Sequence, residues 1–309
     1  MATPRLIPLT LAGTLLLAAC SSGTGDEAVP SLPGEPSASA PVGGAPIDPS
    51  AAEAAAVPVA AAREWAHVHN LTLDGDLLRI GTHEGLWSQA PGQPAQQVSD
   101  QAFDVMGFAQ AGPTTYSSGH PGDDQDAPAD LGLQTSADGG RTWASKSLLG
   151  EVDFHRLRAQ DSTVQGLSAH DGRFLRSNDS GATWSDLGAP ELFDFALDPT
   201  DSRRVIGTRA SGPVRSTDGG RTFQEISDAP RLAFLAWTGP TVYAIATDNT
   251  LHVSTDAGTT WAQAGELVGQ PQALGADGDR VVALAGSTIW ESSDAGRTFT
   301  PRITGLAAH

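Results

Sequence analysis

Ser136-Ala137-Asp138-Gly139-Gly140-Arg141-Thr142-Trp143 is the stretch that decides the fold, because its pattern returns four more times along the chain. The shared pattern is Ser-x-Asp-x-Gly-x-Thr-aromatic. Its five aspartates, separated by 41, 39, 38 and 38 residues, are Asp138, Asp179, Asp218, Asp256 and Asp294. A period near 40 residues, with short apolar runs between the copies, is typical of a radially repeated all-β array.

Each residue type in the pattern suits a tight turn. The aspartate accepts hydrogen bonds from nearby backbone N–H groups, and the glycine after it tolerates a positive φ. The aromatic residue at the end is expected to be buried between neighbouring blades. The five aspartates are therefore predicted to be structural rather than catalytic or metal-binding.

The repeat also predicts the number of blades. Residues 67–305 divided by a period near 40 give about six units. The first unit lacks the turn pattern, and the second is the longest because it carries an acidic insertion around Asp123, Asp124, Asp126 and Asp130. The insertion lacks the spacing of a calcium loop and is expected to be solvated. The predicted fold is an all-β, six-bladed β-propeller.

The pattern resembles the Asp-box (BNR) repeats of sialidases, sortilin-type domains and related propellers. Within that group the chain is similar to exported bacterial Asp-box proteins grouped with the glycosyl hydrolases. The second resemblance rests on His67-Val68-His69, Asp104 to Phe108, Ser118 to Pro121 and Val152 to His155. It implies a propeller fold with Asp-box turns. It constrains the chemistry weakly, because one fold hosts many functions.

The N-terminal segment has the features of an export signal. Arg5 precedes an apolar run that is too short to span a bilayer comfortably, and the run ends in Leu17-Ala18-Ala19-Cys20. This ending resembles the lipobox of bacterial lipoproteins, and Cys20 is the only cysteine of the chain. Residues 1–19 are therefore predicted to be a lipoprotein signal peptide, and Cys20 is predicted to carry the lipid.

A flexible linker is expected after the lipid anchor. Residues 20–62 are rich in Ala, Pro, Gly and Ser and contain no Lys or Arg, so they cannot bury enough apolar area to fold. The propeller is predicted to occupy residues 63–309. The sequence thus predicts a protein exported from a bacterial cell, attached to the membrane only through its lipid and facing outward.

Composition excludes several classes of function. The chain holds 36 acidic and 18 basic residues, a formal net charge of −18, so it lacks the basic stripe that a nucleic-acid-binding protein needs. One cysteine rules out a disulfide framework, an iron–sulfur centre and a multi-cysteine zinc site.

Histidines cluster where a propeller places its functional face. First strands of blades and the ends of second strands meet at the channel mouth opposite the Asp-box turns. Period-two alternation puts His67 with His69, Asp104 with Met106 and Asp153 with His155 on common sides. The ligand-binding residues predicted from these positions are His67, His69, His83, His120, His155 and His170.

Two interpretations of this mouth stay open from the residues alone. Hydrogen-bonded histidines around a water-filled channel are one. The other is a transition-metal site with His67, His69 and His155 as ligands, where Met106 would favour copper and carboxylates would favour zinc. Imidazole must be neutral to bind a metal, so affinity would fall as the pH drops through about 6.5. The partner would be a small molecule, a glycan or an envelope protein.

Glycoside hydrolysis is the alternative function that the family resemblance implies. Most such enzymes use two carboxylates, and Asp104 with Asp153 is the best-placed pair, with Glu84 as a third candidate. True sialidase activity is not expected, because the chain has two tyrosines and no Arg-Ile-Pro motif in the propeller. A protein-interaction platform without a small-molecule site is the third interpretation.

Overall fold

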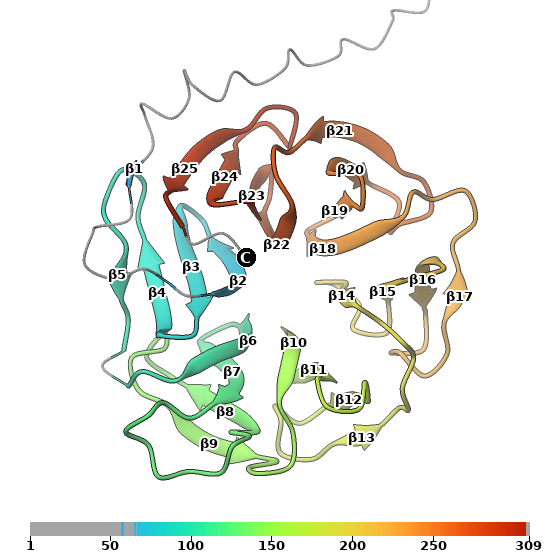
Figure 1. The fold of residues 1–309 in the computed structure, drawn as a ribbon. Helices are drawn as coiled ribbons and strands as arrows, with labels where there is room; N and C mark the ends of the chain where they lie inside the picture. Colours follow the sequence, from blue (N-terminus) through green and yellow to red (C-terminus); the bar gives the residue numbers. More distant parts are fainter. Residues whose placement is uncertain (1–56, 59–64, 66, 100, 307–309) are drawn as a thin grey trace, which may run out of the picture. The chain divides into compact units, whose positions relative to one another are not determined.

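The chain folds as a six-bladed β-propeller in which every blade is an antiparallel sheet of four consecutive strands (Figure 1). The computed structural model describes residues 57–58, 65, 67–99 and 101–306. The predicted signal peptide, Cys20 and all of the predicted linker except residues 57–58 lie outside the described residues. None of the described residues forms a helix long and apolar enough to cross a membrane. The predicted fold class is confirmed.

The first three blades follow one another along the chain. Blade 1 consists of β2 (Val68–Asp74), β3 (Leu77–Thr82), β4 (Gly85–Gln89) and β5 (Gln96–Gln97). Blade 2 consists of β6 (Asp104–Ala111), β7 (Thr114–His120), β8 (Leu133–Ser136) and β9 (Ala144–Ser147). Blade 3 consists of β10 (Phe154–Gln160), β11 (Thr163–Ser168), β12 (Phe174–Ser177) and β13 (Ser185–Asp186).

The last three blades complete the ring. Blade 4 consists of β14 (Asp194–Leu197), β15 (Val205–Arg209), β16 (Gly212–Ser216) and β17 (Gln224–Glu225). Blade 5 consists of β18 (Leu232–Thr238), β19 (Thr241–Ala246), β20 (Thr250–Ser254) and β21 (Ala262–Glu266). Blade 6 consists of β22 (Pro271–Asp277), β23 (Arg280–Ala285), β24 (Thr288–Ser292) and β25 (Thr300–Thr304). The first strand of each blade lies nearest the axis (Figure 1).

Two features close the ring between blades 6 and 1. The two-residue strand β1 (Val57–Pro58) pairs in parallel with β25, ahead of the expected start of the propeller at residue 63. The buried guanidinium of Arg302 donates from Nε to Gln89 Oε1 at 2.6 Å and from Nη2 to Asp76 O at 2.8 Å. Blade 6 is therefore fastened to blade 1 by polar contacts between the two ends of the folded chain.

The repeated turns have the hydrogen bonds expected from their sequence. In the turn of blade 3, Ser177 Oγ donates to Asp179 Oδ1 at 2.7 Å, and the Thr183 N–H donates to the same oxygen at 2.8 Å. The Thr183 hydroxyl donates to Asp179 Oδ2 at 2.6 Å. Led by these two bonds from Thr183, the contacts lower the pKa of Asp179 to about 2. The other four turns repeat the arrangement.

These turns also connect neighbouring blades. Gly181 has a φ of +82°, and a Cβ there would collide with Leu133 on β8 of the preceding blade. The aromatic residues that end the turns pack against the apolar cores, as predicted. Full burial was a wrong expectation for four of them: Phe299 is buried, whereas Trp143, Trp184, Phe223 and Trp261 are half-buried at the rim of their clusters.

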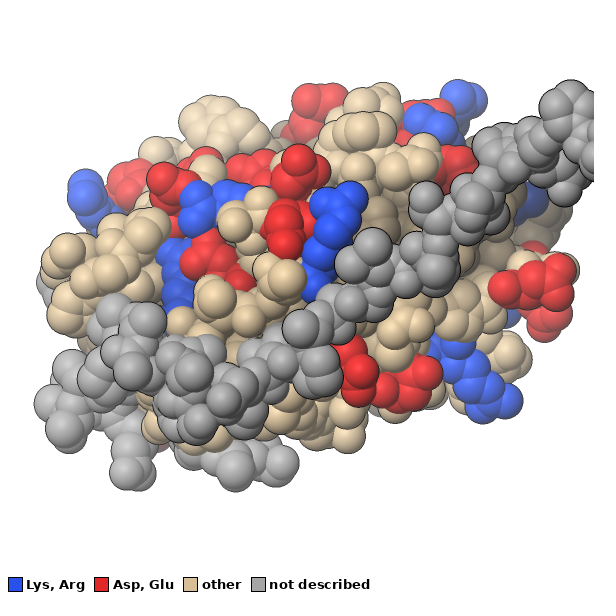
Figure 2. All heavy atoms as spheres, turned by 90° about the horizontal axis from the view of Figure 1, so that it is seen from above, with Lys and Arg blue, Asp and Glu red and all other residues tan. Residues whose placement is uncertain are grey.

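The surface charge is mixed rather than segregated. On the side that Figure 2 shows, acidic and basic side chains lie interspersed among uncharged ones, and the basic ones form no continuous stripe.

Candidate functional site

The first strand carries a one-residue bulge near its start in five of the six described blades. A bulge leaves its residue out of the hydrogen-bonded ladder and redirects its side chain, which is why bulges recur near binding sites. The bulged residues are His69, Met106, His155, Ala233 and Gln272.

Two further positions repeat around the same mouth. His83 directly follows Thr82, and His120 directly follows Gly119. In each blade this preceding residue of the second strand pairs with the first-strand residue just before the bulge. Asp104 and Asp153 each lie two residues before the bulge of the next blade. The end of one blade's second strand therefore meets the start of the next blade's first strand, which brings histidine and aspartate together at two successive junctions.

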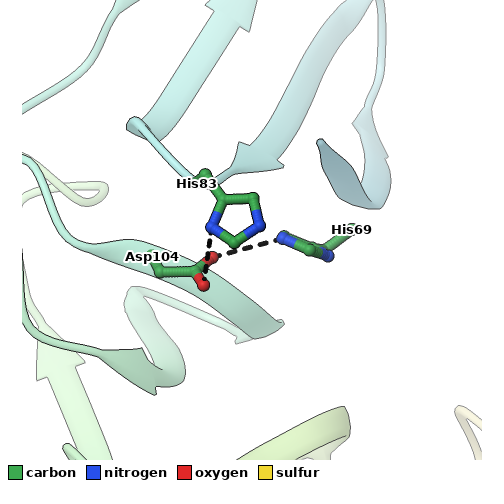
Figure 3. A group of neighbouring side chains, drawn as sticks. All are labelled: His69, His83 and Asp104. Carbon is green, nitrogen blue, oxygen red and sulfur yellow. Dashed lines mark ion pairs between the residues drawn. The ribbon is translucent and has the colours of Figure 1, made fainter. Parts of the chain in front are cut away.

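At the junction of blades 1 and 2, His69, His83 and Asp104 form a group whose ligand atoms all lie within 4.8 Å of one another (Figure 3). His83 Nδ1 lies 2.9 Å from Asp104 Oδ2, and His69 Nε2 lies 3.2 Å from Asp104 Oδ1. The second pair lacks hydrogen-bond geometry, and both of its atoms are buried without a hydrogen-bond partner. A buried carboxylate oxygen and an imidazole nitrogen thus face each other with their polar character unsatisfied.

At the junction of blades 2 and 3, His120, Asp153 and His155 form the second group. Asp153 is only 1% exposed, and its Oδ2 lies 2.7 Å from His155 Nε2 and 3.4 Å from His120 Nε2. Its other oxygen, Oδ1, is buried without a hydrogen-bond partner. Two imidazole nitrogens from different blades therefore converge on one oxygen of a buried carboxylate.

The contact of Nδ1 indicates which ring nitrogen of neutral His120 carries the hydrogen. Nδ1 lies 2.9 Å from the carbonyl oxygen of Ala129, and a carbonyl can only accept, so Nδ1 carries the hydrogen. In neutral imidazole the lone pair is then on Nε2, which faces Asp153. A lone pair that faces a carboxylate is repelled by it unless a proton or a cation lies between the two groups. Histidines that bind metals characteristically donate their other N–H to a carbonyl or carboxylate in this way.

His170 belongs to a separate contact at the rim. Its side chain is 59% exposed, and its Nε2 lies 3.0 Å from Asp130 Oδ1. The hydrogen bond and negative charge of Asp130 raise the pKa of His170 above its usual value. Asp130 also lies 3.9 Å from His120 Nδ1, so it connects His170 to the edge of the second group.

A cleft of about 810 Å³ opens over the two junctions. Its lining includes members of both groups, namely His83 and Asp104 from the first and His120 from the second, together with acidic residues of the blade 2 insertion. Small-molecule sites typically have volumes of about 300–1,000 Å³. The cleft is therefore large enough for a metal ion with a bound organic ligand.

The remaining predicted site residues lie around these groups. The His67 ring stacks on that of His69 with centroids 6.0 Å apart, in agreement with the predicted shared side. Met106 is half-buried, and its carbonyl accepts a hydrogen bond from the Asn70 amide. Glu84 lines the cleft beside His83. Of the six histidines predicted to bind a ligand at the mouth, four lie in two groups, each around its own aspartate.

The sequence did not reveal the partners that complete the second group. Asp130 was assigned to a solvated loop, yet it contacts His170 and lies near His120. The Ala129 carbonyl has no signature in the sequence at all. No local pattern could have found either, because they meet His120 only through the fold of the blade 2 insertion.

Comparison with known proteins identifies the fold without assigning a family. No family model matches the chain, and none of the curated proteins does. Two glycoside hydrolase family 74 structures are similar over part of their length. The enzyme of Niastella koreensis has 16% sequence identity and a TM-score of 0.56, and the similarity covers 78% of this chain and 38% of that one. The Xanthomonas campestris xyloglucanase has 16% sequence identity and a TM-score of 0.53, and the similarity covers 77% of this chain and 46% of that one. A chain of a nidogen–laminin complex is similar at 10% identity, TM-score 0.56, 72% of this chain and 90% of that one. This chain spans less than half of the two hydrolases, and at these identities the similarity concerns the fold alone.

Proposed function

We propose that this protein is an exported, lipid-anchored propeller of the Asp-box class that binds divalent transition-metal ions at its histidine-rich mouth. One observation carries the proposal: two histidines and one buried aspartate converge at each of two successive blade junctions. The turn hydrogen bonds and their aspartates support the Asp-box assignment.

The ligand set suits zinc or copper(II). Zinc takes imidazole nitrogens and carboxylate oxygens at about 2.0–2.2 Å, which places tetrahedral ligand atoms about 3.4 Å apart. The paired atoms of the two groups are separated by 2.7–3.4 Å, so small side-chain shifts would accommodate an ion. Three protein ligands leave one tetrahedral position for a water or an organic ligand in the cleft.

Metal titration tests the proposal. The whole chain, purified without a histidine tag and stripped with EDTA, is titrated with Zn²⁺ and Cu²⁺ by calorimetry, and two ions per chain are expected. His69→Ala/His83→Ala should abolish one of them and His120→Ala/His155→Ala the other. His252→Ala is the matched control, since this histidine contacts Thr250 in blade 5 instead of an aspartate group. A parent protein that binds neither metal would refute the proposal.

Glycoside hydrolysis is the second candidate, and one observation favours it. Asp104 is buried and lines a cleft of a volume that admits a sugar unit. Asp153, its predicted partner, is not part of the cleft lining. The two tyrosines are buried in the core, which argues against sialidase chemistry. Turnover of aryl glycosides by the parent and its loss in Asp104→Asn would favour the hydrolase, whereas absence of turnover together with metal binding would favour the first function.

The location is tested through the proposed lipid. Labelled palmitate should enter the parent chain and not the Cys20→Ser variant, because Cys20 is the only thiol available. Label in the variant would contradict the lipobox assignment.

A further inference from the structure

A second feature lies inside the channel along the propeller axis, and His69 is the one member of the two histidine groups in its described lining. This cavity has a volume of about 290 Å³ and is lined mainly by the first strands of the blades. Its described lining holds two arginines, Arg156 and Arg158, and one carboxylate, Asp194. The channel therefore has one more guanidinium than carboxylate, inside a chain of net charge −18.

The two arginines point to the same side because they are two residues apart on β10. Both share one oxygen of one aspartate: Arg158 Nη2 lies 3.0 Å and Arg156 Nε 3.4 Å from Asp194 Oδ1. The other oxygen of Asp194 accepts the Leu235 N–H at 2.9 Å. One carboxylate cannot neutralise two guanidiniums, so a positive charge is left over next to the cavity.

Both guanidiniums are held in place before any ligand arrives. Arg156 donates to the His155 carbonyl at 3.0 Å, and Arg158 donates to the Leu157 carbonyl at 2.9 Å. Arg156 also lies over the Phe234 ring at 5.9 Å, and Arg158 over the Phe195 ring at 5.5 Å. The backbone carbonyl and Asp194 together engage two of the five N–H donors of each guanidinium. The remaining donors are left for a further acceptor.

The side chains are only partly shielded from the channel. The side chains of Arg156 and Arg158 are each 24% exposed, whereas the side chain of Asp194 is 3% exposed. The aspartate is thus almost completely buried, while both arginine side chains keep exposed surface. Apolar surface from Phe234 and Trp237 lines the same cavity.

We infer that the channel binds a small organic carboxylate, whose charged group pairs with Arg156 and Arg158 and whose apolar body contacts Phe234 and Trp237. Guanidinium and carboxylate match as bidentate partners, and pre-ordered donors lower the entropic cost of binding. The described lining contains neither a tyrosine nor a glutamate, so the arginine pair serves binding and does not complete a sialidase site.

Three aromatic probes of similar size test the charge requirement. Benzoate, benzamide and benzylamine are titrated into the whole chain by ligand-observed NMR in low salt, after the metal has been stripped with EDTA and the EDTA, itself a carboxylate, has been dialysed away. Benzoate is expected to bind, and the neutral and cationic analogues are not. Acetate should bind more weakly than benzoate because it lacks the apolar body. Equal binding of benzoate and benzamide would overturn the inference.

Variants then assign the binding to the arginines. Arg158→Gln and Arg156→Gln should each weaken benzoate binding about tenfold or more, since each removes charged hydrogen bonds. Asp194→Asn should strengthen it, because the competing carboxylate is gone. Arg173→Gln is the control, as Arg173 pairs with Asp171 in the turn between β11 and β12 and is not in the described lining of the channel. If either arginine variant folds and binds benzoate as the parent does, the site is not in the channel.

Because the metal is removed before the titration, failure here leaves the metal proposal untouched. Conversely, a parent that binds benzoate but neither zinc nor copper would retain the channel site and lose the metal site.

Discussion

Blades 1–3 and blades 4–6 have the same four-stranded architecture but present different chemistry at the mouth. At the junctions of blades 1/2 and 2/3, a histidine at or directly after the end of a second strand meets an aspartate at or directly before the start of a first strand. At the junction of blades 5/6 the equivalent positions hold Thr247 and Gln270. Apart from the missing bulge in blade 4, the two halves share one scaffold, so they differ in which residues occupy the bulges and the blade junctions.

The turns show the opposite behaviour. Their Ser-Asp-Thr hydrogen bonds recur in blades 2 to 6 with little variation in length. The same hydrogen bonds thus recur in the turns at one end of the blades, whereas the residues at the mouth differ from blade to blade. The predictions below test this division, beginning with the largest expected effect.

The aromatic residues that end the turns should differ in their contribution to stability according to burial. Phe299 in blade 6 is 3% exposed, and Phe299→Ala should cost about 3–5 kcal/mol of unfolding free energy. Trp184 in blade 3 is half-buried and donates to Ser147 Oγ, so Trp184→Ala should cost less, about 1–3 kcal/mol. Denaturant unfolding measures both. The reverse order would show that exposure at the rim does not govern these contacts.

The turn glycines should be equally intolerant in both halves. Gly181 in blade 3 and Gly296 in blade 6 have positive φ, and a Cβ on either would collide with a leucine of the preceding blade. Gly181→Ala and Gly296→Ala should each cost about 2–4 kcal/mol, from backbone strain plus overpacking.

Gly188 supplies the control for that experiment. Its φ is +85°, but nothing lies within 4 Å of an added Cβ, so Gly188→Ala should incur the backbone strain alone, about 1 kcal/mol. Equal losses at Gly188 and Gly181 would mean that the contact between blades contributes nothing.

The histidine group should be transferable to the half that lacks it. Thr247, Gln270 and Gln272 match His120, Asp153 and His155 in register. The triple variant Thr247→His/Gln270→Asp/Gln272→His should therefore bind one additional zinc ion. Its affinity should be about tenfold weaker than that of the native sites or lower still, because no carbonyl equivalent to that of Ala129 orients the new histidine.

Calorimetric stoichiometry checks this transfer. The double variant Thr247→Ala/Gln272→Ala is the control and should bind as many ions as the parent. A triple variant that gains no ion while it keeps the parent's melting temperature would show that register alone does not make the site.

The smallest effect concerns acid stability. Hydrogen bonds from Thr183 hold the pKa of Asp179 at about 2, below its value near 3.9 in the unfolded chain. A lowered folded-state pKa contributes stability that is complete above the unfolded value and lost as the pH falls through about 2. Asp179→Asn should therefore melt below the parent at pH 7, and the gap should narrow between pH 4 and pH 2.

Asp161→Asn serves as the comparison, since Asp161 lies exposed in the turn between β10 and β11. A constant gap for Asp179→Asn would contradict the role of its hydrogen bonds.

The sequence by itself determined the fold, the blade number and the turn chemistry of this protein. The reason is physical: the hydrogen bonds of each turn close within eight residues, so the spacing of Ser136, Asp138 and Thr142 already specifies them. Strand order and alternation also predicted that the histidines and aspartates lie near the mouth, although bulges interrupt the alternation at His69, Met106 and His155. Those inferences use interactions that are local or repeated.

Only the tertiary structure decided which side chains contact one another at the mouth and in the channel. The division into two groups depends on bulges and on contacts between successive blades, such as His83 with Asp104, that no local pattern encodes. Arg158 and Asp194 meet across 36 positions, and Arg302 reaches Gln89 across 213. Such contacts are specified by closure of the ring, and a sequence read along its length cannot reveal them because each partner looks ordinary in its own segment.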